Sequence, residues 1–381
     1  MLEFFDYECL RIIWWGLLGI LLIGFAVMDG FDLGVGILLP FVAKTDEERR
    51  VVLNTVGPVW EGNQVWFILG GGAIFAAWPH VYAVSFSGFY FAMLLVLLAL
   101  ILRPVGFDYR SKLASKTWRS IWDWCLFISG LVPSLVFGVA MGNVLQGVPF
   151  GFDEFMVINN QIGFWSLFTP FTLLCGLVSV AMLVGHGATY LAIKTEGAIL
   201  ERSTKVLKIF PFITITLFAI GGFLLQKING YELVSFAGTN ADSNPLNKVV
   251  TTSVGGWFSN YQNCYWIILA PFIGFLGQLQ VVVFTSIKHF GKAFISSALS
   301  ISGIIATVGL TLFPFILPSS LEPNSSLIVW DSSSSYRALF VMMIAAIVFV
   351  PLILLYTSWV FRILKGKVTT KEIKSDSNFF Y

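Results

Sequence analysis

The sequence predicts an all-α integral membrane protein, and three observations lead to that prediction. Hydrophobic residues make up 57% of the 381 positions and charged residues only 12%, and the mean hydropathy is +0.83. The apolar residues form long continuous runs, unlike the alternating segments of about ten residues in a transmembrane barrel. Because one spanning helix takes about 20 apolar residues, the chain has room for about eight to ten spans and no sizeable soluble domain.

Apolar runs bounded by polar, proline or glycine breaks give about nine predicted transmembrane helices. We expect a single membrane domain over residues 1–381, built as two four-helix bundles (10–145 and 163–317) plus a peripheral final helix. The predicted spans are 12–43, 51–77, 80–102, 121–145, 163–192, 207–226, 263–286, 293–317 and 338–361.

The first two spans carry local signals of their own. The residues before Ile12 are acidic and lack the basic region of a signal peptide, so the first apolar run is expected to remain as a helix. Thr45 and Glu48 have the spacing of a capping box, which predicts that the second helix begins just before its apolar run. Pro58 predicts a kink in that helix. Gly30 and Gly34 form a G-x-x-x-G pattern, which favours close contact with another helix.

The loops between the later spans indicate orientation. The segments that follow the first, third, fifth, seventh and ninth runs hold 19 of the 23 lysines and arginines. Because cytoplasmic loops carry the excess of basic residues, the N-terminus is expected outside and the C-terminus inside. The outer loops 227–262 and 318–336, rich in Ser, Asn and Gly, are expected to be the longest and most mobile.

Composition also argues against several functions. A net charge of +2 without a separate basic patch argues against nucleic acid as a partner. The four cysteines have no C-x-x-C spacing and are expected to serve packing. Axial heme ligation calls for a positioned His, Met, Cys or Tyr, and the three scattered histidines form no pair. We therefore expect neither a metal site nor a catalytic residue within this chain.

Three acidic residues lie inside the first two predicted spans. Asp29 and Asp32 are three positions apart in the first span, and Glu61 lies in the middle of the second. An ionisable group in hydrocarbon costs about 2.5–3.5 kcal/mol on insertion scales, so such residues usually face a bundle interior and serve ion or proton movement. The acids predict a proton pathway, with Arg103 at the inner end of the third span as a counter-charge.

Depth along the helices supports this grouping. At 1.5 Å per residue, Asp32 and Glu61 both lie roughly 15–17 Å from the cytoplasmic ends of their helices. Asp29 lies one turn further out, on the same face as Asp32. Two plainer interpretations stay open: the acids could join the first two helices as a polar pair, and Arg103 could be an anchor at the membrane interface.

A polar patch surrounds Glu61 in the sequence. Amides and indoles on a lipid-facing helix would be poorly tolerated, so this patch is expected to face protein, water or a partner subunit. Its members are Trp60, Asn63, Gln64 and Trp66.

Eight motifs, in order along nearly the whole chain, resemble subunit II of the cytochrome bd quinol oxidases. They are GFAVMDGFDLGVG from Gly24, WEGNQVW from Trp60, FAAWP from Phe75, RPVGFDYRSK from Arg103, GNVLQGVPF from Gly142, GATYL from Gly187, NPLNK from Asn244 and LFPFILPSS from Leu312.

The resemblance implies a subunit of a respiratory complex in the bacterial cytoplasmic (inner) membrane, which oxidises quinol and reduces dioxygen to water. It implies that the hemes, of b and d type, are ligated by a subunit I that pairs with this chain. Whether a small third single-helix subunit is also present stays open. Some members hold a structural quinone within subunit II, and the residues that would contact it here stay unassigned.

The resemblance also implies roles for single residues. Asp32 and Glu61, with Arg103 nearby, match acids on a proton route from the cytoplasm to heme d. The family often has Asp where this chain has Glu61, so the acid is kept while its reach changes. Trp66 matches a position close to a lateral oxygen entrance.

Two other functions compete with this reading. A proton-coupled secondary transporter would also carry intramembrane acids and glycine-interrupted helices, but it would show inverted repeats with helices broken at the midplane. A passive scaffold would stabilise a heme-bearing partner, and its acids would be merely structural.

Overall fold

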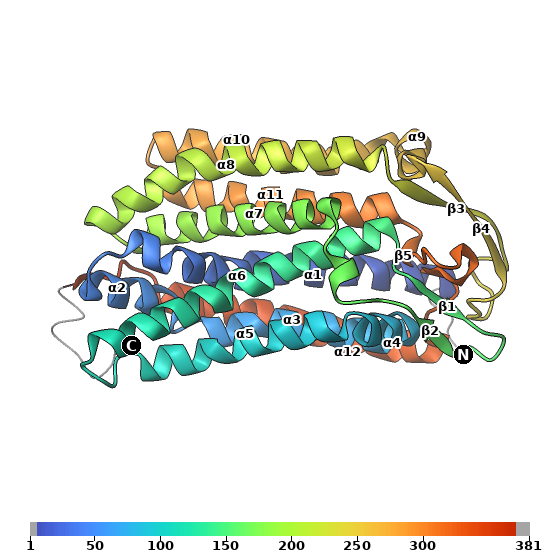
Figure 1. Ribbon diagram of the computed structural model, residues 1–381, viewed down its shortest axis with the longest axis horizontal. Helices are drawn as coiled ribbons and strands as arrows, with labels where there is room; N and C mark the ends of the chain where they lie inside the picture. The colour runs from blue at the N-terminus through green and yellow to red at the C-terminus, as the bar shows by residue number, and fades with distance from the viewer. Residues whose placement is uncertain (1–5, 371–381) are drawn as a thin grey trace.

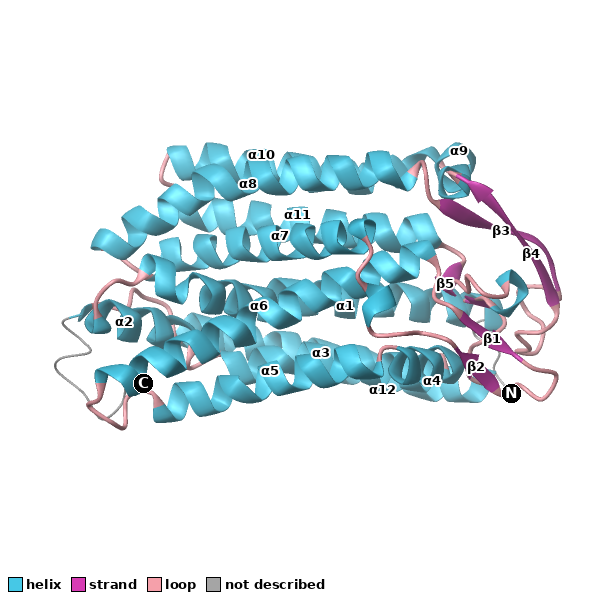
Figure 2. Ribbon diagram, in the orientation of Figure 1, coloured by secondary structure: helices cyan, strands magenta, loops and turns pink. Residues whose placement is uncertain are grey.

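The computed structural model describes residues 6–370, and its helices lie side by side along one long axis (Figures 1 and 2). Residues 1–5 of the acidic N-terminal segment, together with Lys371 and Lys374 from the orientation argument, lie outside the described residues. Three short antiparallel sheets gather at one end, which we call the strand end. We call the opposite end, where α2 lies, the charged end.

The helices are α1 (Tyr7–Val42), α2 (Asp46–Val56), α3 (Trp60–Ala77), α4 (Pro79–Gly88), α5 (Tyr90–Tyr109), α6 (Lys116–Gln146), α7 (Pro170–Lys194), α8 (Gly197–Leu225), α9 (Ser259–Asn263), α10 (Leu269–Ser286), α11 (Phe290–Leu312) and α12 (Tyr336–Ile363). The strands are β1 (Phe150–Phe152) with β2 (Ile158–Asn160), β3 (Asn229–Phe236) with β4 (Lys248–Val254), and β5 (Phe315–Leu317) with β6 (Leu327–Ile328).

The all-α prediction is confirmed, and the long helices form two bundles. In the first, α1 packs against α3 and α6, and α6 packs against α5. In the second, α7 and α10 each lie between α8 and α11. Helix α1 also contacts α7 and α11 and so joins the two bundles, while α12 packs on α1 and α3.

Eight helices of the described chain are long and apolar enough to cross a membrane. The second predicted span, 51–77, corresponds to α2 and α3 and is not among these eight, because the expected kink at Pro58 is a complete break. Helix α2 ends at Val56, a turn covers Gly57 to Val59, and α3 starts anew at Trp60. Proline lacks the N–H that a continuous helix needs. The third predicted span is also divided, at Phe89 between α4 and α5.

The close contact between α1 and α7 depends on glycines, which have no Cβ atom. A Cβ at Gly34 would lie 2.0 Å from the backbone oxygen of Leu183, and a Cβ at Gly187 would lie 2.6 Å from the backbone of Gly34. Only glycine lets the two backbones approach so closely. The close helix contact predicted from Gly30 and Gly34 is therefore confirmed.

The segments predicted as outer loops, 227–262 and 318–336, contain short strands and form a packed cap at the strand end. Ser319, Ser326 and Ser332 are buried, and Lys248 forms an ion pair of 2.6 Å with Asp331. Burial lowers the pKa of Lys248 and raises the pKa of Asp331, and the ion pair opposes both shifts. The loops thus bury an ion pair between β4 and the segment before α12.

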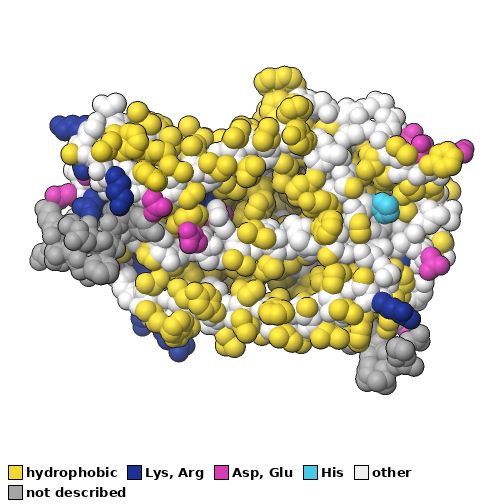
Figure 3. Space-filling view, turned by 90° about the horizontal axis from the view of Figure 1, so that it is seen from below, with side chains coloured by type: hydrophobic (Ala, Val, Ile, Leu, Met, Phe, Trp, Pro, Cys, Tyr) yellow, Lys and Arg dark blue, Asp and Glu magenta, His cyan; other side chains and the backbone are white. Residues whose placement is uncertain are grey.

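A network of charges joins three helices at the charged end. Arg110, at the end of α5 and fully buried, donates to Asp123 of α6 at 2.6 Å and to Asp46 of α2 at 2.9 Å. Arg49 of α2 also donates to Asp123, at 2.6 Å. Figure 3 shows one face of the molecule from outside. The middle of that face is largely hydrophobic, and most of the visible lysines and arginines lie at one end.

Candidate functional site

The centre of the candidate site is an ion pair inside the first bundle. Asp29 and Asp32 are on α1, and both are almost completely buried, with 1% and 5% of their surface exposed. Arg103 of α5 donates from Nη1 to Asp29 Oδ1 at 2.7 Å and is only 3% exposed. Arg103 is therefore buried inside the bundle and forms an ion pair with Asp29.

Asp32 has a different partner. Its Oδ2 accepts a hydrogen bond of 2.8 Å from the Asn63 side chain on α3. Its Oδ1 is buried without a hydrogen-bond partner among the described residues, as is Nη2 of Arg103. The two aspartates and Arg103 together carry a net charge of −1 when all are ionised, so one carboxylate has no full counter-charge.

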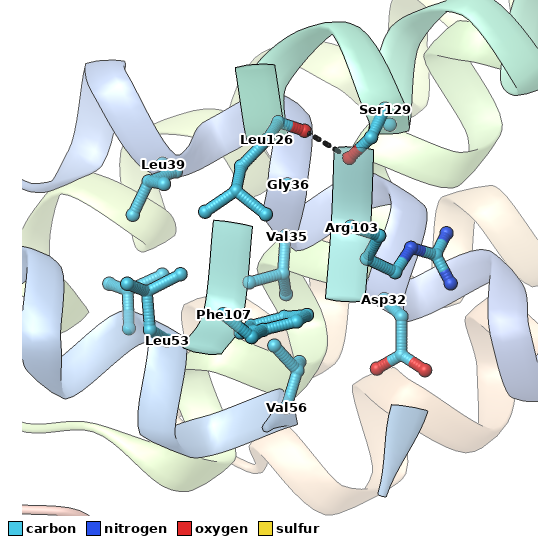
Figure 4. Close-up of a pocket in the computed structure, with 12 residues that line it drawn as sticks. Asp32, Val35, Gly36, Leu39, Leu53, Val56, Arg103, Phe107, Leu126 and Ser129 are labelled. Atoms are coloured by element: carbon cyan, nitrogen blue, oxygen red, sulfur yellow. Dashed lines mark hydrogen bonds between the residues drawn. The ribbon is translucent and has the colours of Figure 1, made fainter. Parts of the chain in front are cut away.

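A small cavity borders Asp32 and Arg103 (Figure 4). It offers about 20 Å³ to the centre of a water molecule. Asp32, Arg103 and Ser129 lie towards one side of it, and Leu39 and Leu53 lie at the other. Its remaining walls are apolar side chains and glycines of α1, α2, α5 and α6: Val35, Gly36, Val52, Val56, Phe107, Leu126 and Gly130.

Glu61 lies apart from this cluster. It is exposed on the surface of α3, while Asn63, two positions further on, points inward and is 2% exposed. Glu61 makes no hydrogen bond or ion pair within residues 6–370. The matching depth of Glu61 and Asp32 therefore does not bring the two carboxyl groups into contact in this chain.

The predicted polar patch is divided between the two faces of α3. Trp60 is buried and stacks on Phe107, with ring centroids 5.5 Å apart. Trp66 is also buried, and its ring occupies the space where a Cβ at Gly24 would stand. Gln64 is half-buried. The indoles and Asn63 thus pack inside the bundle, on a different side from Glu61.

Comparison with known proteins then decides the family. A family model described as cytochrome bd terminal oxidase subunit II matches residues 10–364. The chain belongs to this family. It is 46% identical to the cytochrome bd-I ubiquinol oxidase subunit 2 of Escherichia coli K12, over 99% of this chain and 100% of that protein. It is 29% identical to the cytochrome bd ubiquinol oxidase subunit 2 of Bacillus subtilis, over 94% of this chain and 97% of that protein.

The fold of this subunit II agrees with a solved structure. The bd oxidase from Geobacillus thermodenitrificans aligns with a TM-score of 0.67 at 18% identity, over 93% of this chain and 98% of that chain. Membership of the family makes the chain a multi-pass membrane subunit of a quinol:oxygen oxidoreductase complex that contains heme. The secondary transporter is not favoured.

The histidines of this subunit II do not fit axial heme ligation. Both ring nitrogens of His186 are engaged, with Ser297 Oγ and with the backbone oxygen of Val27, each at 3.0 Å. His289 is exposed, and His80 packs edge-on near Phe152. Among the described residues, no group of three His, Cys, Asp or Glu side chains is arranged to hold a metal ion. No step of the mechanism is therefore assigned to a heme within this chain.

Sequence reasoning missed the residues that complete the site. Phe107 and Ser129 line the cavity, and Asp123 and Arg110 anchor the charged end below it. Asp123 could have been found as a lone acid at the start of a long apolar run. The sequence does not mark Phe107 and Ser129 as site residues, because apolar and small residues occur throughout spanning helices.

Proposed function

We propose that this subunit II acts with a heme-bearing subunit I to support the oxidation of membrane quinol and the reduction of dioxygen to water. Subunit I would hold the hemes of b and d type. The role of this chain would be to stabilise that partner and to supply protons from the cytoplasm through Asp29, Asp32 and Glu61, with Arg103 as counter-charge.

The observation that carries this proposal is the carboxyl group of Asp32, buried beside a cavity without a full counter-charge. Because a charge in hydrocarbon is costly, an intramembrane acid of this kind is best explained by a role in ion or proton transfer. Arg103 compensates Asp29, which leaves Asp32 as the acid that can take up and release a proton.

Glu61 belongs to the same proposal, although its side chain lies on the outside of the bundle. It begins an exposed stripe on α3 that continues through Val65, Ile68 and Phe75, of which Ile68 is 70% and Phe75 is 60% exposed. An acid at one end of an apolar face favours contact with another subunit over contact with lipid. We propose that Glu61 transfers protons at the interface with subunit I and that Trp66 lies near the oxygen entrance.

The remaining assignments follow from the family. We propose the bacterial cytoplasmic membrane as the location, with the strand end outside and the charged end inside, in keeping with the basic loops. A structural quinone and a small third single-helix subunit would be compatible with the exposed apolar faces of α8 and α12, and no residue is assigned to either.

The test uses the intact complex. Asp32→Asn and Glu61→Gln are expected to leave the heme content unchanged and to lower quinol-dependent oxygen consumption by about 10²-fold, the lower end for proton-transfer groups. Asp108→Asn, an exposed carboxyl at the charged end of α5, is the matched control and should keep wild-type turnover. Full activity in both test variants would favour the passive scaffold instead.

A further inference from the structure

The outer surface of α8 has an open hollow of about 450 Å³. Figure 1 shows α8 and α10 along one edge of the molecule and α3, α5 and α12 along the opposite edge. The hollow therefore lies away from the face of α3 that is proposed to contact subunit I. Its lining residues all belong to α8: Lys208, Ile209, Phe212, Ile213, Thr216 and Leu217.

Lys208 lies at the boundary between the apolar part of α8 and the charged end. Residues 209–225, which complete α8, contain no charged side chain. At 1.5 Å per residue this apolar run is about 25 Å long, close to the thickness of the hydrocarbon core of a membrane. Lys208 therefore stands at the level of the phospholipid headgroups. In the proposed orientation these headgroups belong to the inner leaflet.

Lys208 also differs from the two basic side chains that precede it on α8. Arg202 forms an ion pair with Glu48, and Lys205 forms one with Glu201. Lys208 is exposed and forms no ion pair within residues 6–370. Its positive charge is thus available to an anion at the membrane surface.

The hollow has the polarity and the length of one half of a membrane. Leu217, at its other end, is nine residues beyond Lys208, about 14 Å along the helix axis. That is about half the thickness of the hydrocarbon core. Thr216 is the one polar side chain that lines the hollow besides Lys208. A positive charge at headgroup level is therefore followed by an apolar wall that reaches the middle of the membrane.

We propose that this hollow binds a phospholipid with an anionic headgroup from the inner leaflet. The phosphate pairs with the ammonium group of Lys208, and an acyl chain lies along Ile209, Ile213 and Leu217. A lysine close to the membrane surface favours anionic lipid, and no acid in residues 209–225 opposes it. The inference rests on the proposed orientation of the chain and is independent of the proposed proton uptake.

Two other occupants fit the hollow less well. A quinone ring is neutral, so it would leave Lys208 without a counter-charge. A spanning helix of a small third subunit would follow α8 over its whole length, whereas the hollow ends at Leu217. Both occupants are outcomes that the test distinguishes from a phospholipid.

The first arm of the test is a cryo-electron microscopy map of the intact complex in nanodiscs of palmitoyl-oleoyl phosphatidylglycerol. We expect a headgroup phosphate within ion-pair distance of Lys208 Nζ and chain density that extends to Leu217. An empty hollow, a flat ring without a phosphate or a helix in this place overturns the proposal.

The second arm identifies the bound lipid by photo-crosslinking. The complex carries p-benzoylphenylalanine in place of Phe212, which lines the hollow, or in place of Phe272, an exposed residue of α10 that does not. It is irradiated in vesicles with equal amounts of phosphatidylglycerol and phosphatidylcholine, and mass spectrometry identifies the adducts. We expect phosphatidylglycerol to be enriched about fivefold at position 212, the factor for one lysine near a membrane surface, and not at position 272. Equal amounts of both lipids at position 212 overturn the proposal.

Variants of Lys208 show whether its charge causes the enrichment. Lys208→Gln should abolish the enrichment at position 212, and Lys208→Arg should keep it. Lys227→Gln removes the same charge beyond the other end of α8 and should keep it as well. Enrichment that survives Lys208→Gln, or that falls equally in Lys227→Gln, contradicts a site at Lys208. Neither arm measures turnover, so their results leave the proposed proton uptake to its own test.

Discussion

Arg103 and Asp29 form an ion pair of 2.7 Å in the interior of the first bundle, with 4% and 2% of their side chains exposed. Asp32, one turn further along α1, has an amide as its partner instead. The two aspartates therefore have different partners although they lie on one helix face. In the proposed function, Asp29 balances the charge of Arg103 and Asp32 exchanges a proton.

This difference in partners predicts a large loss of stability for one variant and a small change for a similar one. Asp29→Asn removes the carboxylate that pairs directly with the buried Arg103, so the complex should lose about 3–5 kcal/mol of stability. Asp32→Asn keeps the hydrogen bond from Asn63 and should change stability by less than about 1 kcal/mol. Thermal unfolding of the purified complex, followed by heme release, compares the two. Equal losses of stability would contradict the assignment of Arg103 to Asp29.

A second prediction concerns the ion pair as a unit. Removing either charge alone, by Asp29→Leu or Arg103→Met, should destabilise the complex strongly, because the other charge stays buried. The double variant should recover most of the loss, since well-packed apolar residues often replace a buried ion pair without cost. A double-mutant cycle of unfolding midpoints measures this recovery, and additive losses would show that the two groups act independently.

The α1 and α7 contact gives a third prediction. Gly34→Ala places a methyl group against the Leu183 backbone, where the distance of 2.0 Å leaves no room. Overpacking of this kind costs about 1–3 kcal/mol or more. Gly19→Ala on the same helix meets nothing within 4 Å and should be neutral or slightly stabilising. We expect a lower yield and a lower melting temperature for Gly34→Ala than for Gly19→Ala. Equal values would contradict the close contact between α1 and α7.

A fourth prediction concerns pH and Glu48 at the charged end. Burial alone would raise the pKa of Glu48, but hydrogen bonds from Arg202 and from the backbone of Lys44 and Thr45 outweigh it, so its pKa lies below the ordinary 4.5. A lowered pKa stabilises the folded state above pH 4.5, and this contribution disappears as the pH falls through the lowered pKa.

Glu48→Gln should therefore lower the melting temperature at pH 7, with a loss of about 0.5–2 kcal/mol typical of a helix cap. The difference from wild type should shrink as the pH falls below 4.5. Glu201→Gln is the control: its pair with Lys205 is about 70% exposed on both sides and contributes little. A difference that stays constant with pH would show that the charge of Glu48 is not its source.

The sequence by itself determined the class of this protein, its family and the residues worth testing. Long apolar runs require helices in a membrane, the capping box of Thr45 and Glu48 is present as predicted, and the glycine pattern at Gly30 and Gly34 marks a real helix contact. These features are local, because each depends on residues a few positions apart along one helix.

Only the tertiary structure decided which groups meet. Depth along a helix can be counted at 1.5 Å per residue, but the direction in which a side chain points depends on how each helix is rotated about its axis. The break at Gly57 and Pro58 restarts the rotation of α3, so that Asn63 faces Asp32 and Glu61 faces away from the bundle. The pairing of Arg103 with Asp29, and the cavity beside Asp32, likewise arise from the packing of α6 against both α1 and α5, which no spacing in the sequence encodes.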